Sequence, residues 1–157
     1  MLLEGSCHCG AVRFSLESAT PQPYMHCYCS ICRKTGGGSG SAINLGGDAG
    51  SLTVQGEDNI SIYQARIGGE LSAARRHFCK LCGSALWAFD PRWPDLVHPF
   101  ASAIDTPLPT PPERVHIMLG SKPAWVAVPE GPAERHFPEY PEHSIDDWHA
   151  AHGLTVP

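Results

Sequence analysis

The stretch "HFCKLCGSALWAFD", residues 77–90, contains two features that recur along the chain. Cys79 and Cys82 are separated by two residues and followed by Gly83, which is the spacing of a tight turn. Such a turn can direct two thiolates and some backbone N–H groups toward one metal ion. The run 84–90 is short and apolar and lies between a glycine and a proline. The stretch therefore predicts a cysteine-bearing turn attached to a β-strand.

Short apolar runs with a period of two predict an all-β fold class. In residues 11–17, Val12, Phe14 and Leu16 alternate with more polar side chains, as in a half-buried strand. The same kind of pattern predicts further strands at 51–56, 59–65, 84–90, 114–120 and 124–129. The 16 glycines and 15 prolines favour short strands and many turns over long helices.

Two short segments have helical signals. Residues 30–36 are compatible with a helical turn that ends at Gly36. Residues 143–153 offer Ser144 as an N-cap and Gly153 as a C-cap. The proline-rich stretch 89–113 is predicted to be a long, semi-rigid loop. No linker divides the sequence, so we expect one zinc-binding β domain over residues 1–157.

Charge and hydropathy exclude several classes of partner. The net charge is -5, and the basic clusters are confined to 33–34 and 75–77, so nucleic-acid binding is not expected. No apolar stretch approaches the ~20 residues that span a bilayer, so no membrane partner is expected. The N-terminus lacks the basic head and apolar run of a secretory signal, which favours a cytoplasmic location. Thiols stay reduced there, so clustered cysteines indicate metal ligands or redox groups.

The seven cysteines are arranged as a pair, a triplet and a pair. In an extended segment, residues i and i+2 point to the same side, so Cys7 and Cys9 could direct both sulfurs to one point. Together with Cys79 and Cys82 they would form a closed shell of four sulfurs. Such a shell is typical of a structural zinc site, which leaves no position for water or substrate.

The triplet Cys27, Cys29 and Cys32 predicts a second zinc with an open fourth position, which is typical of a reactive site. Sulfur ligands favour zinc over magnesium or calcium. A zinc-bound thiol loses its proton near neutral pH and becomes a nucleophile. Arg33 and Lys34 are candidate substrate-binding residues that would attract an anionic thiol. Without metal, three neighbouring thiols readily form a disulfide, so this site can also be empty or oxidised.

Three alternatives for the triplet stay open at the level of sequence. It could be a second structural zinc site completed by a histidine, namely His8, His26 or His77. It could be a redox-active thiol set without metal. It could also contribute to a zinc-ribbon-like double C-x₂-C site, formed by Cys29 and Cys32 with Cys79 and Cys82. The pair-plus-pair arrangement is preferred because it leaves no cysteine without a role.

The cysteine motifs and their flanks resemble segments of the glutathione-dependent formaldehyde-activating enzyme family. The similar segments follow one another in the same order and cover nearly the whole chain: "GSCHCGAVRF" (5–14), "CYCSICRKTGG" (27–37), "RRHFCKLCGSALW" (75–87), "RVHIMLGSKPAWVAV" (114–128) and "HFPEYPEHSIDDWHAAHG" (136–153). The resemblance implies antiparallel β-sheets in a tent-like arrangement organised around two zinc sites, with little helix. It also implies structural zinc ligands at Cys7, Cys9, Cys79 and Cys82, and catalytic zinc ligands at Cys27, Cys29 and Cys32.

The resemblance implies an activity that joins formaldehyde to glutathione as S-hydroxymethylglutathione, formally a carbon–sulfur lyase reaction run in reverse. We therefore expect a zinc-dependent enzyme that acts on a glutathione-type thiol adduct at the open three-cysteine zinc. The alternative is a non-catalytic zinc module that binds a protein partner or stores metal. A fixed fourth protein ligand at the triplet would favour this alternative.

Overall fold

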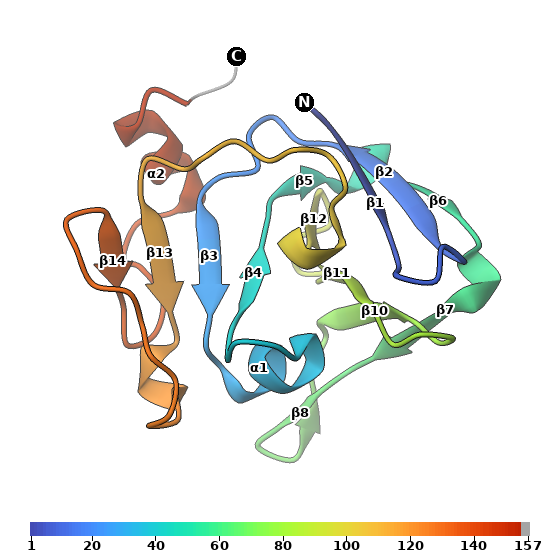
Figure 1. The fold of residues 1–157 in the computed structure, drawn as a ribbon, viewed down its shortest axis with the longest axis horizontal. Coiled ribbons are helices and arrows are strands. Elements are labelled where there is room, and N and C mark those ends of the chain that lie inside the picture. Colours follow the sequence, from blue (N-terminus) through green and yellow to red (C-terminus); the bar gives the residue numbers. More distant parts are fainter. Residues whose placement is uncertain (155–157) are drawn as a thin grey trace.

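The computed structural model describes residues 1–154, so the last three residues of the predicted 1–157 domain lie outside the described residues. Within this range the chain forms four sheets of short strands (Figure 1). The three-stranded sheet has the order β1 (Leu2–Ser6), β2 (Arg13–Glu17) and β6 (Thr53–Gln55). The five-stranded sheet has the order β5 (Gly47–Asp48), β12 (Leu96–Pro99), β11 (Ala85–Phe89), β10 (Arg75–Cys79) and β7 (Ile60–Tyr63).

The other two sheets have four strands and two strands, and the four-stranded sheet contains Cys27 of the triplet. The four-stranded sheet has the order β14 (Glu134–His136), β13 (Arg114–Ile117), β3 (Tyr24–Cys27) and β4 (Ala42–Asn44). A two-stranded ribbon pairs β8 (Arg66–Ile67) with β9 (Glu70–Leu71). Figure 1 shows the four-stranded sheet on one side of the molecule and β1, β2 and β6 on the other, with β10–β12 between them.

The predicted all-β class is confirmed, because strands dominate and most neighbouring strands are antiparallel. Five of the predicted strand segments contain a strand, namely β2, β6, β7, β11 and β13. In β2 the predicted alternation is clear, since Phe14 and Leu16 are buried while Arg13 and Glu17 are exposed. The four-stranded sheet is a departure from a purely antiparallel fold: β13 runs parallel to both β3 and β14.

Two sequence predictions were wrong. The predicted strand 124–129 is irregular, with Trp125 exposed at 68% and Val126 buried. A β-carbon at Gly40 would lie 2.5 Å from Val126, so this segment packs through one side chain instead of through strand pairing. The predicted loop 89–113 contains strand β12, which pairs with β11 and β5. Pro99 is accommodated because it ends the strand, beyond the residues that pair with β5.

The two predicted helices are present. Helix α1 spans Ser30–Gly36 and lies at the ends of β3 and β4 (Figure 1). Helix α2 spans Ile145–Ala151 and begins at Ser144, whose hydroxyl accepts a hydrogen bond from the Asp147 amide in a capping box. The helix ends at Ala151 with His152 as its C-cap, and the following Gly153 adopts the left-handed φ of +66° that favours glycine.

The core has two parts that coincide with the two cysteine groups. The larger part lies between the three- and five-stranded sheets and contains Phe14 and Trp87, whose ring centroids are 5.0 Å apart. Burial of each such side chain contributes about 1.5–3 kcal/mol. The smaller part contains Phe100, Val115 and Ile117. Cys7 and Cys79 belong to the larger cluster, and Cys27 and Cys32 belong to the smaller one.

Short connecting elements complete the described chain. Four 3₁₀ turns link the strands, at Ala49–Ser51, Glu57–Asn59, Ala101–Ala103 and Leu119–Ser121. Neither helix within residues 1–154 has the length and apolar character needed to span a bilayer.

Candidate metal centres

The first cysteine group lies where two hairpin turns meet. Cys7 and Cys9 belong to the turn between β1 and β2, and Cys79 and Cys82 border the turn between β10 and β11. The four sulfur atoms all lie within 4.8 Å of one another, so this group could hold a metal ion. The His8 amide donates a 3.0 Å hydrogen bond to the Ser84 hydroxyl, which ties the two turns together.

The sulfur atoms of this group have short contacts and backbone donors. The sulfur of Cys9 is 3.5 Å from that of Cys7 and 3.9 Å from that of Cys79. The Val12 amide donates to the Cys7 sulfur at 3.3 Å. Hydrogen bonds from the Ser84 hydroxyl and the Ser84 backbone lower the pKa of Cys82 to about 5. The local backbone is therefore prepared to stabilise negative charge on sulfur.

The geometry of Cys7 and Cys9 differs from the extended segment considered from the sequence. The two cysteines lie in a tight turn, closed by hydrogen bonds from the Gly10 amide to the Cys7 carbonyl and from the Cys7 amide to the Val12 carbonyl, both 3.0 Å. Gly10 adopts a φ of +76°, which a glycine accepts without strain. Tight turning of the backbone, and not the alternation of a strand, brings the two sulfurs together. The turn expected at Cys79 and Cys82 is present, with the Gly83 amide donating to the Cys79 carbonyl at 2.8 Å.

The second cysteine group lies at the junction of β3 and α1. Cys27 is the last residue of β3, Cys29 is the N-cap of α1, and Cys32 lies in its first turn. Their three sulfurs also lie within 4.8 Å of one another and could hold a metal ion. Among residues 1–154, no histidine, aspartate, glutamate or further cysteine joins this group as a fourth ligand. The zinc-ribbon-like pairing of Cys29 and Cys32 with Cys79 and Cys82 is not formed, because the two groups are separate.

The Cys29 sulfur accepts hydrogen bonds within the triplet. The Cys32 amide donates to the Cys29 sulfur at 3.3 Å, as an N-cap side chain requires. Hydrogen bonds from the Cys27 and Cys32 thiols and from backbone N–H groups lower the pKa of Cys29 to about 2. The same contacts, together with burial, raise the pKa of Cys27. These hydrogen bonds favour the thiolate form of Cys29.

Arg76 on β10 is the basic residue that contacts the triplet. Its Nη2 donates to the Cys32 sulfur at 3.1 Å, and its Nη1 donates to the Thr35 hydroxyl at 3.4 Å. The guanidinium carbon lies 5.7 Å from the centre of the Phe100 ring, which packs beside the triplet. A positive charge therefore lies beside the sulfurs. The sequence indicated Arg76 only as part of the basic cluster 75–77, and not as a neighbour of the triplet.

The other residues singled out from the sequence are two basic residues of helix α1 and three histidines. Arg33 follows Cys32 in α1, and its Nε is buried without a hydrogen-bond partner among the described residues. Lys34 is exposed. None of the candidate histidines joins either cysteine group: His8 is exposed, His26 packs its ring 4.9 Å from His116, and His77 stacks on Trp87 at 5.0 Å.

A C-terminal segment runs beside the triplet. Phe137 packs against the cluster that contains Cys27 and Cys32, and the Met118 amide donates to the Glu139 carbonyl at 2.8 Å. Residues 137–140, 142 and 143 line a hollow of about 410 Å³. Partial burial and the negative charge of the three cysteines raise the pKa of Tyr140, which lines this hollow.

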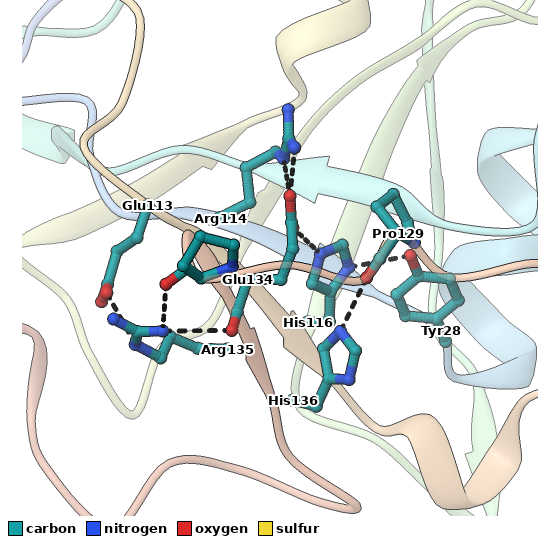
Figure 2. A network of polar contacts seen from close by, with 9 residues as sticks. Tyr28, Glu113, Arg114, His116, Pro129, Glu134, Arg135 and His136 are labelled. Carbon is teal, nitrogen blue, oxygen red and sulfur yellow. Dashed lines mark hydrogen bonds and ion pairs between the residues drawn. The ribbon is translucent and has the colours of Figure 1, made fainter.

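A buried polar chain beside the triplet was not expected from the sequence (Figure 2). The Tyr28 hydroxyl lies 2.9 Å from Nδ1 of His116, and Nε2 of the same ring lies 2.7 Å from Glu134. His116 was expected to be a packed core residue, and it is fully buried. The contact with Tyr28 spans 88 residues of sequence, so no local pattern could have indicated it.

Comparison with known proteins agrees with this arrangement of cysteines. The family sequence model described as "Glutathione-dependent formaldehyde-activating enzyme" matches residues 2–121, which include all seven cysteines. A protein of Halomonas elongata, named "Putative glutathione-dependent formaldehyde-activating enzyme", is 63% identical over 154 residues, which is 98% of each chain. The crystal structure of a Rhodobacter sphaeroides protein superposes with a TM-score of 0.55 at 27% identity, over 68% of this chain and 91% of that one.

The family match covers well over half of the chain, and the relative from Halomonas elongata is similar over almost its full length. Both comparisons therefore lead to the family that the cysteine motifs resemble. The chain belongs to the glutathione-dependent formaldehyde-activating enzyme family.

Proposed function

We propose that this protein is a zinc-dependent enzyme of the carbon–sulfur lyase type, which forms or cleaves a glutathione-type thiol adduct such as S-hydroxymethylglutathione. The reaction would take place at Cys27, Cys29 and Cys32, with Cys7, Cys9, Cys79 and Cys82 as ligands of a structural zinc. The observation that carries the proposal is the difference in completeness between the two groups. Four sulfurs form one group, whereas three sulfurs without a fourth protein ligand among residues 1–154 form the other.

The sulfur spacing fits zinc. A tetrahedron with Zn–S distances of about 2.3 Å has S–S edges of about 3.8 Å. The S–S contacts of 3.5 and 3.9 Å in the four-cysteine group are close to this value. The mutual distances within the triplet have the same upper limit of 4.8 Å, so three corners of a second tetrahedron fit there. All-sulfur ligands select zinc over the harder cations.

The proposed reaction adds the sulfur of glutathione to the carbonyl carbon of formaldehyde. A carbon–sulfur bond forms, the carbon–oxygen double bond becomes single, and the thiol proton ends on the hydroxymethyl oxygen, so nothing is oxidised. Zinc at the triplet would lower the pKa of the bound thiol and so supply the thiolate. The cleavage direction reverses these changes.

The residues around the triplet would orient the substrate. Arg76 already donates to Cys32, and its remaining N–H groups can attract a carboxylate of glutathione. Arg33 and Lys34 are proposed to add to this attraction from helix α1. The apolar side chains of Phe100 and Phe137 pack against the same cluster and would limit access of water.

The test is the rate of S-hydroxymethylglutathione exchange with ¹³C-formaldehyde and glutathione, followed by NMR. We expect wild-type protein to accelerate the exchange and Cys29→Ser to lower the rate to that of the uncatalysed reaction. Ser30→Ala is the matched control, because Ser30 is the exposed neighbour of Cys29 at the start of α1. This control should keep the wild-type rate.

Zinc content separates the two candidate functions. Two zinc ions per chain, of which one is removed faster by a chelator and is protected by glutathione, would support the enzyme. An unchanged exchange rate in zinc-loaded Cys29→Ser would contradict the catalytic role. Two inert zinc ions and no acceleration by wild type would support a non-catalytic zinc module instead.

We further propose a cytoplasmic location. The seven cysteines are all free in the structure, and a reducing compartment would keep them so. The proposed substrate is a thiol that also requires reducing conditions. The location can be checked by fractionation of cells that express the tagged protein.

A further inference from the structure

Tyr28 is the residue that joins two ligands of the triplet. Strand β3 ends at Cys27 and helix α1 begins at Ser30, so Tyr28 and Cys29 alone connect them. The Tyr28 side chain is 3% exposed and reaches strand β13 (Figure 2). The orientation of Tyr28 therefore affects where the sulfurs on both sides of it lie.

Tyr28 is attached to β13 at two points. Its amide donates to the Ile117 carbonyl at 3.1 Å. Its hydroxyl is 2.9 Å from Nδ1 of His116, the preceding residue of the same strand. One attachment holds the backbone and the other holds the end of the side chain, so rotation of the peptide between Cys27 and Cys29 is opposed at both ends.

The attachment of the hydroxyl continues into a buried chain of polar groups. His116 is fully buried, and its Nε2 lies 2.7 Å from Oε2 of Glu134, whose side chain is 3% exposed. The other carboxylate oxygen of Glu134 accepts from Nε of Arg114 at 2.8 Å and also from its Nη2. Arg114 reaches solvent, so the chain connects the triplet side of the sheet with a charged surface residue.

The direction of these hydrogen bonds is determined by Glu134. Hydrogen bonds from Arg114 and His116 lower the pKa of Glu134 to about 2, so this group is a carboxylate and can only accept. Nε2 of His116 therefore carries a hydrogen. In the neutral ring, Nδ1 is then an acceptor for the Tyr28 hydroxyl. In this arrangement both ring nitrogens of His116 and both carboxylate oxygens of Glu134 have a hydrogen-bond partner.

We infer that Tyr28, His116, Glu134 and Arg114 form a positioning network that holds the spacing of the triplet sulfurs for metal binding. This inference rests on the proposed function, because it assumes that the triplet binds zinc. Glu134 lies on β14, outside residues 2–121 that the family model matches. Edge strand β14, in the C-terminal part of the chain, therefore contributes the last buried side chain of this network.

The network differs from an ordinary buried hydrogen bond by its position in the chain. Tyr24, at the other end of β3, is also buried at 8% exposure, and its hydroxyl donates to the Pro109 carbonyl at 2.6 Å. Loss of either hydroxyl leaves one buried acceptor without a donor, so a general effect on stability should be similar. Only Tyr28 lies between two triplet cysteines.

The experiment measures zinc protection of the cysteines in the full-length protein. Iodoacetamide modification is followed at a series of buffered free zinc concentrations, and mass spectrometry of peptides reports each cysteine group separately. For Tyr28→Phe we expect half-protection of Cys27, Cys29 and Cys32 to require about 10- to 100-fold more free zinc than in wild type. Protection of the four-cysteine group should be unchanged, and Tyr24→Phe should leave both groups unchanged.

Glu134→Gln tests the same network from its far end. It keeps the size of the side chain, removes the charge that faces Arg114, and does not touch the triplet, so we expect a shift in the same direction but smaller. This variant also decides the question if Tyr28→Phe does not fold.

Two outcomes would overturn the inference. Tyr28→Phe or Glu134→Gln could match the wild-type zinc dependence at the triplet, or both cysteine groups could shift together, as a general loss of stability predicts. A wild-type triplet that zinc never protects would instead refute the proposed function itself. The inference fails alone when the wild-type triplet binds zinc and the variants bind it equally well.

Discussion

The four-cysteine group and the triplet use different parts of the fold to bring their sulfurs together. The four-cysteine group takes its sulfurs from two hairpin turns, each closed by its own short-range hydrogen bonds. The triplet takes its sulfurs from one continuous segment, but that segment is held by β13 and β10, which are distant in sequence, and β13 is in turn contacted by β14. The first group joins two sheets, whereas the second is supported on one side and incomplete on the other. This difference is the basis of our proposal that one group stabilises the fold and the other binds a substrate.

The largest expected effect is a loss of thermal stability when one ligand of the four-cysteine group is removed. The same substitution in the triplet should change the stability much less. Structural zinc in small domains has an apparent binding free energy of about 10–16 kcal/mol, which is also folding free energy. If Cys79→Ser loses about a third of this, or about 3–5 kcal/mol, the Tm should fall by about 7–21 °C, since 1 kcal/mol shifts a domain of this size by about 2–4 °C. Cys29→Ser should lower the Tm by only a few degrees. Circular dichroism melting of the two zinc-loaded variants measures the difference.

Equal losses of Tm in the two variants would remove the distinction between a structural and a reactive group. A barely changed Tm in Cys79→Ser would show that the four-cysteine group is not needed for folding. Lys80→Ser is the control, since Lys80 is the exposed neighbour of Cys79 in the same turn and should melt like wild type.

The second comparison concerns the positive charge beside the triplet. A charge-assisted hydrogen bond contributes about 1.5–3 kcal/mol. Arg76→Met should therefore lower kcat/KM for glutathione about tenfold or more, while Arg75→Met should leave it unchanged. Arg75 is the exposed preceding residue on the same strand, so the pair separates a local contact from overall charge. A similar decrease in both variants would indicate long-range attraction, and would remove Arg76 from the site.

The difference between the two groups also explains what the sequence could predict. The C-x₂-C spacing and Gly83 are enough to indicate the turn between β10 and β11. The alternation around Phe14 is enough to indicate strand β2. Those features depend on neighbours within a few residues. The conformation of Cys7 and Cys9 stays open at the level of sequence, because a C-x-C spacing fits both an extended segment and the tight turn that is formed.

The supports of the triplet could not be predicted because they depend on long-range strand order. The parallel pairing of β13 with β3 places His116 beside Tyr28, although 88 residues separate them. Arg76 contacts Cys32 because the fold brings strand β10 of the five-stranded sheet beside helix α1, although 44 residues separate the two side chains. The stretch 124–129 has the composition of a strand but pairs with no other strand within residues 1–154. Its Val126 side chain packs against Gly40 instead.

The smallest expected effect is the acid sensitivity of the sheet that supports the triplet. Glu134 has a pKa of about 2 in the folded protein and an ordinary value of 4.5, because Arg114 and His116 donate to it. A carboxyl group with a lowered pKa stabilises the fold above pH 4.5, and this contribution is lost as the pH falls from 4.5 toward 2. At saturating zinc, wild type should melt about 2–6 °C above Glu134→Gln at pH 6, and this gap should narrow as the pH falls below 4.5 and close only near pH 2. Glu130→Gln, at an exposed position, should follow wild type throughout. A gap that stays constant with pH would show that packing, and not the charge of Glu134, holds β14 against β13, and would weaken the contrast between a self-contained group and one that depends on distant strands.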